Sequence, residues 1–255
     1  MPEYRPRKTL FNPDLRRRGI YILPNLFTTA ALFSGFYAIV QAMNGKFEVA
    51  AVAIFVAMVF DGLDGRVARL THTQSAFGAE YDSLSDMVSF GAAPALVIYE
   101  WALKDLGKLG WIAAFIYCVG AALRLARFNT NLEVVDKRWF QGLPSPAAAA
   151  LVAGLVWVMI DNEWSGQEAR WYACTLTIFA GVTMVTNLRY YSGKNINLRK
   201  SVPFIIVVAV ALGFALVSSY PPGVLFALFL IYSLSGYLVA VLDWWAKRKK
   251  LAPDE

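Results

Sequence analysis

Long apolar runs alternate along the chain with short polar segments that contain glycine, proline or charged residues. A helix needs about 20 predominantly apolar residues to cross the hydrocarbon core of a bilayer. The runs predict eight helices, at Ile20–Met43, Phe47–Phe60, Gly78–Leu103, Leu109–Phe128, Ser145–Ile160, Trp171–Leu188, Val202–Val217 and Val224–Trp245. We therefore predict an all-α integral membrane protein with about eight transmembrane helices.

Three of these predictions depend on polar or proline positions. The run Phe47–Phe60 is too short to span alone, and it spans only if its helix continues through the charged residues up to Arg69, with that end in water or lined by protein. Pro24 is predicted in the first turn of its helix, where proline is tolerated, and Pro94 predicts a kink. Residues 1–19 are basic and contain three prolines, which predicts a tail or surface-lying segment.

Composition and charge support a membrane protein and orient it. The 255 residues are 58% hydrophobic, with a net charge of +6, which is more apolar than a typical soluble domain. With eight crossings, 20 of the 24 Lys and Arg residues fall on the side of both termini. By the positive-inside rule, both termini and the polar region around residues 61–86 are cytoplasmic, in the cell (inner) membrane. The basic excess then reflects topology and anionic lipid, and nucleic-acid binding is not expected.

Four aspartates stand out in this apolar chain, because an acid at membrane depth costs roughly 2.5–3.5 kcal/mol on insertion scales. They lie in two stretches, Asp61-Gly-Leu-Asp64-Gly65-Arg-Val-Ala68-Arg69 and Gly78-Ala-Glu-Tyr-Asp82-Ser-Leu-Ser-Asp86. At about 100° per residue, each stretch places its acids and small residues on one helix face. If the two helices pack as a hairpin, four carboxylates converge beside bare backbone.

Carboxylate oxygens in such a group suit Mg²⁺ or Mn²⁺, with Ca²⁺ as a further option. The small residues leave room for a large flat ligand, and a diphosphate bridged to a divalent metal fits, with one carboxylate left to take a proton from a hydroxyl. One alternative is a structural ion-pair network with Arg69. Another is a cation transporter, which predicts charges scattered along a path through the bilayer, whereas these charges cluster at one end.

The pattern Asp61-x2-Asp64-Gly65-x2-Ala68-Arg69-x8-Gly78-x3-Asp82-x3-Asp86 resembles the signature of the CDP-alcohol phosphatidyltransferase family. The resemblance covers about residues 20–190 as a six-helix core, and the two helices in residues 191–255 look like an addition. Four further stretches resemble the phosphatidylserine synthase branch of this family, namely Leu23-Pro-Asn-Leu-Phe-Thr28, Ser89-Phe-Gly-Ala-Ala-Pro94, Arg124-Leu-Ala-Arg-Phe-Asn129 and Gln141-Gly-Leu-Pro-Ser-Pro146.

The resemblance implies transfer of a phosphatidyl group from CDP-diacylglycerol to L-serine, with release of CMP, and a homodimer. Other acceptors remain open: glycerol 3-phosphate, inositol phosphate or choline. It implies that the divalent metal is held by Asp61, Asp64, Asp82 and Asp86. Of these, Asp82 and Asp86 are assigned as catalytic, with Asp86 as the general base. The resemblance also implies that Gly65, Ala68 and Gly78 contact the cytidine nucleotide. It implies that Arg69 supports the acids or the diphosphate.

For several polar residues, the sequence allows two different roles. Asn25 and Thr28 either cap the helix near Pro24 or line the nucleotide site. Arg124 and Arg127 lie three apart on one helix face and are either membrane anchors or a pocket for the serine carboxylate or lipid phosphate. Asn129 and Ser145 are tentative members of that acceptor pocket. No Ser, Cys or His is placed as an obvious covalent nucleophile, which favours direct displacement.

Overall fold

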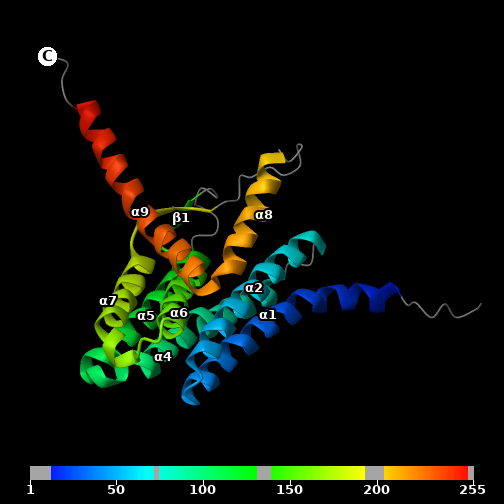
Figure 1. The fold of residues 1–255 in the computed structure, drawn as a ribbon. Coiled ribbons are helices and arrows are strands. Elements are labelled where there is room, and N and C mark those ends of the chain that lie inside the picture. Colours follow the sequence, from blue (N-terminus) through cyan, green and yellow to red (C-terminus); the bar gives the residue numbers. More distant parts are fainter. Residues whose placement is uncertain (1–12, 72–74, 131–138, 193–203, 252–255) are drawn as a thin grey trace, which may run out of the picture.

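The computed structural model describes residues 13–71, 75–130, 139–192 and 204–251, and within these the fold is almost wholly helical (Figure 1). The predicted helical class is therefore confirmed. The α-helices are α1 (Pro13–Met43), α2 (Phe47–Thr71), α3 (Ala76–Asp86), α4 (Ala93–Ile98), α5 (Lys108–Thr130), α6 (Ser145–Asp161), α7 (Gly166–Val185), α8 (Phe204–Ser219) and α9 (Pro221–Leu251). Shorter π- or 3₁₀-helical segments are η1 (Met87–Ala92), η2 (Tyr99–Leu103) and η3 (Lys104–Leu106).

The helices pack through small residues. In α6 the run Ala147–Ala150 is at most 6% exposed, so neighbouring helices approach its backbone. Gly120 of α5 faces Gly181 of α7 so closely that a Cβ on Gly120 would lie 2.4 Å from the Gly181 carbonyl oxygen. Small residues permit this approach in a bilayer, where dispersion contacts between helices stabilise the bundle.

The helical run that follows α3 changes register around Pro94. The π-helical segments η1 and η2 flank α4, which has Pro94 in its first turn. Proline has no N–H, so it leaves the carbonyl four residues earlier without its usual helical donor. That carbonyl belongs to Phe90, and the hydroxyl of the fully buried Tyr117 donates to it at 2.9 Å. The sequence indicated an irregularity here, but not its π-helical form or the donor from α5.

Three local predictions are wrong. α1 begins at Pro13, not Ile20, so Pro24 lies inside the helix and not in its first turn. α9 begins at Pro221, three residues before the predicted start at Val224. The segments after the predicted helices Leu109–Phe128 and Trp171–Leu188, where no strand was predicted, contain the short strands β1 (Trp139–Gln141) and β2 (Arg189–Tyr191). These strands pair antiparallel, with Phe140 opposite Tyr190. Three-residue strands give too little alternation to be recognised without their partner.

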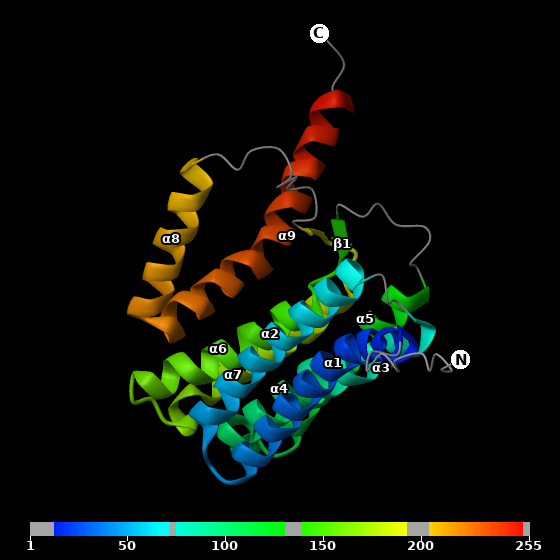
Figure 2. The same cartoon turned by 90° about the vertical axis from the view of Figure 1, so that its right-hand side faces the viewer.

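Three helices in the described part of the chain are long and apolar enough to cross a membrane: Leu23–Met43, Lys108–Thr130 and Pro221–Ala246. The apolar helices at Ser145–Asp161 and Val210–Ser219 are shorter. The full count of eight spans stays a prediction. α8 stands apart from the body formed by α1–α7 and meets α9 at one end (Figure 2). Its exposed side chains include Val210, Leu212 and Phe214, which fits lipid contact.

Candidate active site

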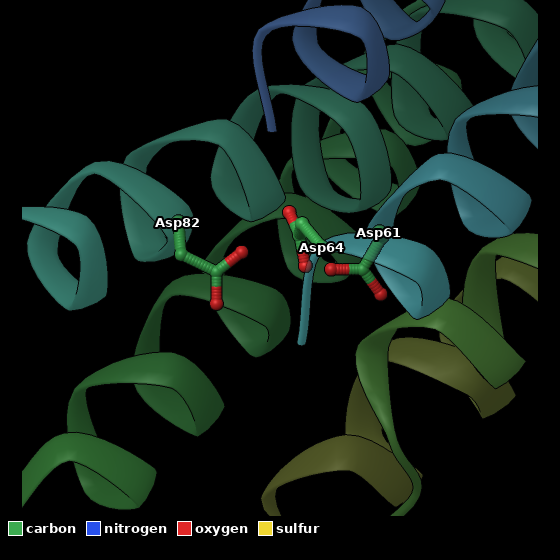
Figure 3. Close-up of side chains that lie close together, drawn as sticks. All are labelled: Asp61, Asp64 and Asp82. Carbon is green, nitrogen blue, oxygen red and sulfur yellow. The ribbon is translucent and has the colours of Figure 1, made fainter. Parts of the chain in front are cut away.

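Three carboxylates converge where α2 approaches α3 (Figure 3). Asp61 and Asp64 come from α2 and Asp82 from α3, and each offers an oxygen within 4.8 Å of the others. Oxygens that share one hard cation lie about 2.0–2.6 Å from it, so pairs on opposite sides are separated by roughly 4–5 Å. The acids therefore lie at a spacing that one divalent cation can bridge, although α2 and α3 each pack on α1 and not against each other as the expected hairpin.

The surroundings of the acids fit a bound cation. Asp64 is only 6% exposed and accepts a hydrogen bond of 2.7 Å from Thr28 Oγ1. Asp82 Oδ1 is buried and has no hydrogen-bond partner among the described residues, although an unpaired buried carboxylate oxygen is costly. The Asp86 carboxylate lies near that of Asp61, but Asp86 is not in the group of three acids whose oxygens lie within reach of one cation. Ionised carboxylates that lie close together repel each other, and a bound cation would relieve that repulsion.

Serine residues that the sequence interpretation did not assign hold α3 in place. Ser85 Oγ donates to the Thr28 carbonyl and Ser89 Oγ to the Ala31 carbonyl, each at 3.1 Å, which ties the acid-bearing segment to α1. Ser75 caps α3, and its Oγ accepts from the Gly78 N–H at 3.0 Å. A serine before a helical run is a recognisable capping signal. Ser85 and Ser89 had no such signal, because their partners are backbone carbonyls on another helix.

An open pocket of about 250 Å³ lies beside the acids. Its lining combines two acids with all but one of the residues predicted to contact the nucleotide: Asn25, Thr28, Asp64, Gly65, Ala68, Gly78 and Asp82. Pro24, Ser75 and Ala79 complete it and were not predicted. A Cβ on Gly65 would reach no protein atom closer than 4.0 Å. Gly65 therefore leaves space inside the pocket, and it is not needed for close packing between helices.

Arg69 does not neutralise the acids in this structure. It is exposed, and its Nε donates to the Gly65 carbonyl of its own helix at 2.7 Å. The ion pair found within the described ranges joins Lys104 and Glu100, at 2.8 Å. The alternative of an Arg69 ion-pair network is therefore not supported by the described geometry, and Arg69 leaves the charge of the acid cluster uncompensated.

Arg124 is the basic residue buried near the acids. Its side chain is 9% exposed, and Nη1 donates to Ser145 Oγ at 2.6 Å. Its Nε has no hydrogen-bond partner in the part of the chain that the structure describes. Asp86 and Asp61 are within electrostatic range, but neither forms an ion pair with it in that part. Arg124 thus keeps donor capacity for an anion close to the acids.

Arg127, three residues later, has a different role. Its Nη1 and Nη2 groups lie within 3.0–3.2 Å of oxygen atoms of Gln141, Met184, Val185, Thr186 and Asn187. It therefore stabilises the C-terminus of α7, whose last carbonyls lack helical donors, and the adjoining β1 strand. Asn129 Nδ2 donates to Ser83 Oγ at 3.0 Å. Both residues bind other parts of the chain, so the structure does not support their assignment to an acceptor pocket.

These features define a class: a helical protein with apolar helices of membrane-spanning length, and a candidate divalent-metal site beside an open pocket. A model of the CDP-alcohol phosphatidyltransferase family matches residues 21–185, and the chain belongs to this family. The match ends before α8 and α9.

Curated relatives carry a common name, CDP-diacylglycerol–serine O-phosphatidyltransferase. The chain is 36% identical to the one from Helicobacter pylori strain 26695 over 236 residues, which is 91% of this chain and 98% of the relative. It is 37% identical to the one from Methanocaldococcus jannaschii over 187 residues, 72% of this chain and 81% of the relative. A relative from Mycobacterium tuberculosis strain H37Rv is 34% identical over 179 residues, 68% of this chain and 62% of the relative.

Proposed function

We propose that this chain is a membrane enzyme that transfers the phosphatidyl group of CDP-diacylglycerol to the hydroxyl of L-serine and releases CMP. The observation that carries the proposal is the convergence of three carboxylates, one with an unpartnered buried oxygen, beside a pocket lined by small residues. The family and the names of the relatives supply the substrates.

The acids would serve as cation ligands, and one of them, Asp86, would also serve as the base. Asp61, Asp64 and Asp82 would hold Mg²⁺ or Mn²⁺, with Asp86 as a further ligand; the cation would neutralise negative charge on the diphosphate. The pocket walls at Gly65, Ala68 and Gly78 let the nucleotide approach the helix backbone. Thr28 orients Asp64 through its hydrogen bond, and Asn25 lines the same wall.

The chemistry is a direct displacement. The serine oxygen forms a bond to the lipid-side phosphorus, and the bond from that phosphorus to the CMP oxygen breaks, with its electron pair leaving on CMP. Asp86 accepts the hydroxyl proton, because a carboxylate beside the acceptor is the simplest base there. A lipid-phosphoryl enzyme trapped without acceptor would contradict this single step.

Serine is favoured over a phosphorylated acceptor by the separate roles of the two arginines. Arg127 is used by the protein's own oxygen atoms, which leaves the single buried guanidinium of Arg124 near the acids. One guanidinium matches one carboxylate, whereas a phosphate dianion calls for more positive charge. With its carboxylate on Arg124, an amino acid as small as serine would present its hydroxyl towards Asp86.

The test is CMP release by the purified full-length protein in detergent micelles with CDP-diacylglycerol and Mg²⁺ or Mn²⁺. Acceptors are L-serine, glycerol 3-phosphate, inositol phosphate and choline, assayed separately. Of the four acceptors, we expect only L-serine to give CMP release. We expect that release to be lost when EDTA removes the metal. Release with a different acceptor would overturn the choice of serine, and no release with any acceptor would overturn the enzyme class.

We also propose that the end of the bundle with the acids faces the cytoplasm, as the distribution of basic residues indicates. The test uses single cysteines in a variant that lacks Cys118 and Cys174. Lys108→Cys should react with a membrane-impermeant maleimide in intact cells, whereas Arg66→Cys should react only after permeabilisation. The reverse pattern would contradict the orientation. Cross-linking in native membranes tests the homodimer, which remains a prediction.

A further inference from the structure

A second open pocket, of about 260 Å³, lies where β2 meets the last part of α9. It shares no lining residue with the pocket beside the acids. Its apolar members come from both walls, and its polar members are an amide, an indole and one charged side chain of each sign. The lining consists of Asn187, Leu188, Arg189, Val239, Ala240, Asp243 and Trp244. This composition suits a small ligand that has charged groups and an apolar part.

The two walls of this pocket are held together by Tyr190, the middle residue of β2. Tyr190 is fully buried, and its hydroxyl donates to the Ser233 carbonyl of α9 at 2.8 Å. A Cβ on Gly236 would lie 2.3 Å from the Tyr190 ring. Ala240 lies one helical turn after Gly236 on the same face of α9, and Asp243 follows about one turn later. The position of the pocket is therefore fixed by the docking of β2 on α9.

The two charged side chains of the pocket are not paired with each other. Arg189 and Asp243 both line it, yet the ion pair found in the described ranges joins Lys104 and Glu100. Arg189 and Asp243 are also exposed, and neither side chain forms a hydrogen bond to another described residue. Two opposite charges that share a pocket without pairing suit a ligand that carries both charges. Its anionic group would lie on the guanidinium and its cationic group on the carboxylate.

Asn187 adds a donor for the anionic group. Its Oδ1 accepts from Arg127 Nη1 at 3.2 Å and from Gln141 Nε2 at 3.0 Å. These two contacts hold the side chain and fix the orientation of its amide. Its Nδ2 group has two N–H donors, and it donates to no other residue in the part of the chain that the structure describes. Asn187 and Arg189 therefore offer several N–H groups to one oxyanion.

The position of the pocket on α9 favours a lipid over a soluble molecule. Its α9 wall belongs to Pro221–Ala246, which is long and apolar enough to cross a membrane. Nearby, Val241 and Leu242 are 54% and 68% exposed, as expected of side chains that contact acyl chains. The Arg248 guanidinium lies 4.2 Å from the centroid of the Trp244 ring. Aromatic and basic side chains gather in this way at the membrane–water interface, which places the pocket at the depth of lipid headgroups.

We propose that this pocket binds the headgroup of an aminophospholipid, with the phosphodiester on Arg189 and Asn187 and the ammonium group on Asp243. Phosphatidylethanolamine and phosphatidylserine share these two groups, whereas phosphatidylglycerol has the phosphodiester and no amine. The site goes beyond the proposed reaction. Binding is measured without turnover, so its failure and the failure of the proposed reaction are distinguishable.

The test is native mass spectrometry of the purified full-length protein, released from detergent micelles and titrated separately with short-chain forms of the three lipids. We expect each aminophospholipid to bind about tenfold more tightly than phosphatidylglycerol, because a hydrogen bond between two charged groups discriminates at least that strongly. Equal binding of all three lipids would overturn the role of the amine. Free phosphoethanolamine distinguishes a lipid from a soluble ligand: if it binds as tightly as phosphatidylethanolamine, the lipid assignment is wrong.

Two variants that remove a charge assign the residues. Asp243→Asn should bind phosphatidylethanolamine no more tightly than phosphatidylglycerol, whereas Arg189→Gln should weaken the binding of both lipids about tenfold. The matched controls are Asp105→Asn in η3 and Arg170→Gln near the start of α7, the end of that helix remote from β2. Both controls should leave both affinities unchanged. An Asp243→Asn protein that still prefers phosphatidylethanolamine, or controls with effects as large as those of the pocket variants, would overturn the proposal.

Discussion

The pocket beside α2 and the seam between α5 and α7 both depend on glycine, but for opposite reasons. At the seam, a Cβ on Gly120 would lie 2.4 Å from a backbone oxygen of Gly181, so the protein itself fills the space. In the pocket, a Cβ on Gly65 would reach no protein atom closer than 4.0 Å. One glycine permits helix packing, and the other leaves space that the protein does not use.

The comparison teaches that a small residue is evidence of a ligand only where the structure leaves the adjacent space open. An open position on a helix surface is common, so Gly65 carries weight because two acids share its pocket. Substitutions should therefore separate the two regions: changes in the pocket should reduce activity and preserve stability, and changes at the seam should do the reverse.

The largest expected effect is that of Asp86→Asn. It removes the proposed base and leaves side-chain volume nearly unchanged, so turnover should fall by about 10²–10⁴-fold while the unfolding midpoint in detergent holds. CMP release and thermal unfolding are measured on the same preparation. Asp105→Asn, in the η3 segment, is the control and should remain active. Near-normal turnover of Asp86→Asn would show that another group accepts the proton.

Gly120→Ala should give the largest change at the seam. The added methyl meets backbone atoms that cannot rotate away, and overpacking of this kind costs typically about 1–3 kcal/mol. We expect a lower unfolding midpoint and, below it, normal KM values. Gly213→Ala in α8, where a Cβ would meet nothing within 4 Å, is the control. An unchanged midpoint for Gly120→Ala would mean that α5 and α7 are not so closely packed.

Gly65→Ala should have a smaller effect, and on function. The methyl would project into the proposed nucleotide pocket, so the KM for CDP-diacylglycerol should rise about tenfold, equivalent to about 1.4 kcal/mol. The KM for serine and the unfolding midpoint should be preserved. Initial rates at varied CDP-diacylglycerol, with serine saturating, provide the measurement. If CDP-diacylglycerol binds normally, the pocket is not the nucleotide site.

Gly62→Ala should have the smallest effect and should be favourable. Gly62 lies one helical turn before Gly65 in α2, is exposed, and a Cβ there would meet nothing within 4 Å. Alanine in place of an exposed helical glycine stabilises by roughly 0.5–1 kcal/mol. The variant should unfold slightly later than wild type with unchanged kinetics. Lost activity would mean that the substrate also contacts this part of α2.

Much of the site was predictable because its signals are local. The spacing of Asp61 and Asp64 on one helix, and of Gly78 and Asp82 on the next, follows from helical geometry. The structure groups Asp61, Asp64 and Asp82, and it places Asp64, Gly78 and Asp82 around one pocket. The sequence could not distinguish the roles of the two arginines. Arg124 and Arg127 share a face in sequence, but one bonds to Ser145 and the other to oxygen atoms around the end of α7.

The sequence by itself determined the helical class, the family signature and the placement of the acids on two adjacent helices, because hydrophobicity and helical periodicity are properties of neighbouring residues. Only the tertiary structure decided which small residues face open space, which arginine stays available to an anion, and that α9 packs on α6 and β2. Those features depend on contacts between residues such as Arg127 and Met184, which are distant in the chain, and no local pattern encodes such contacts.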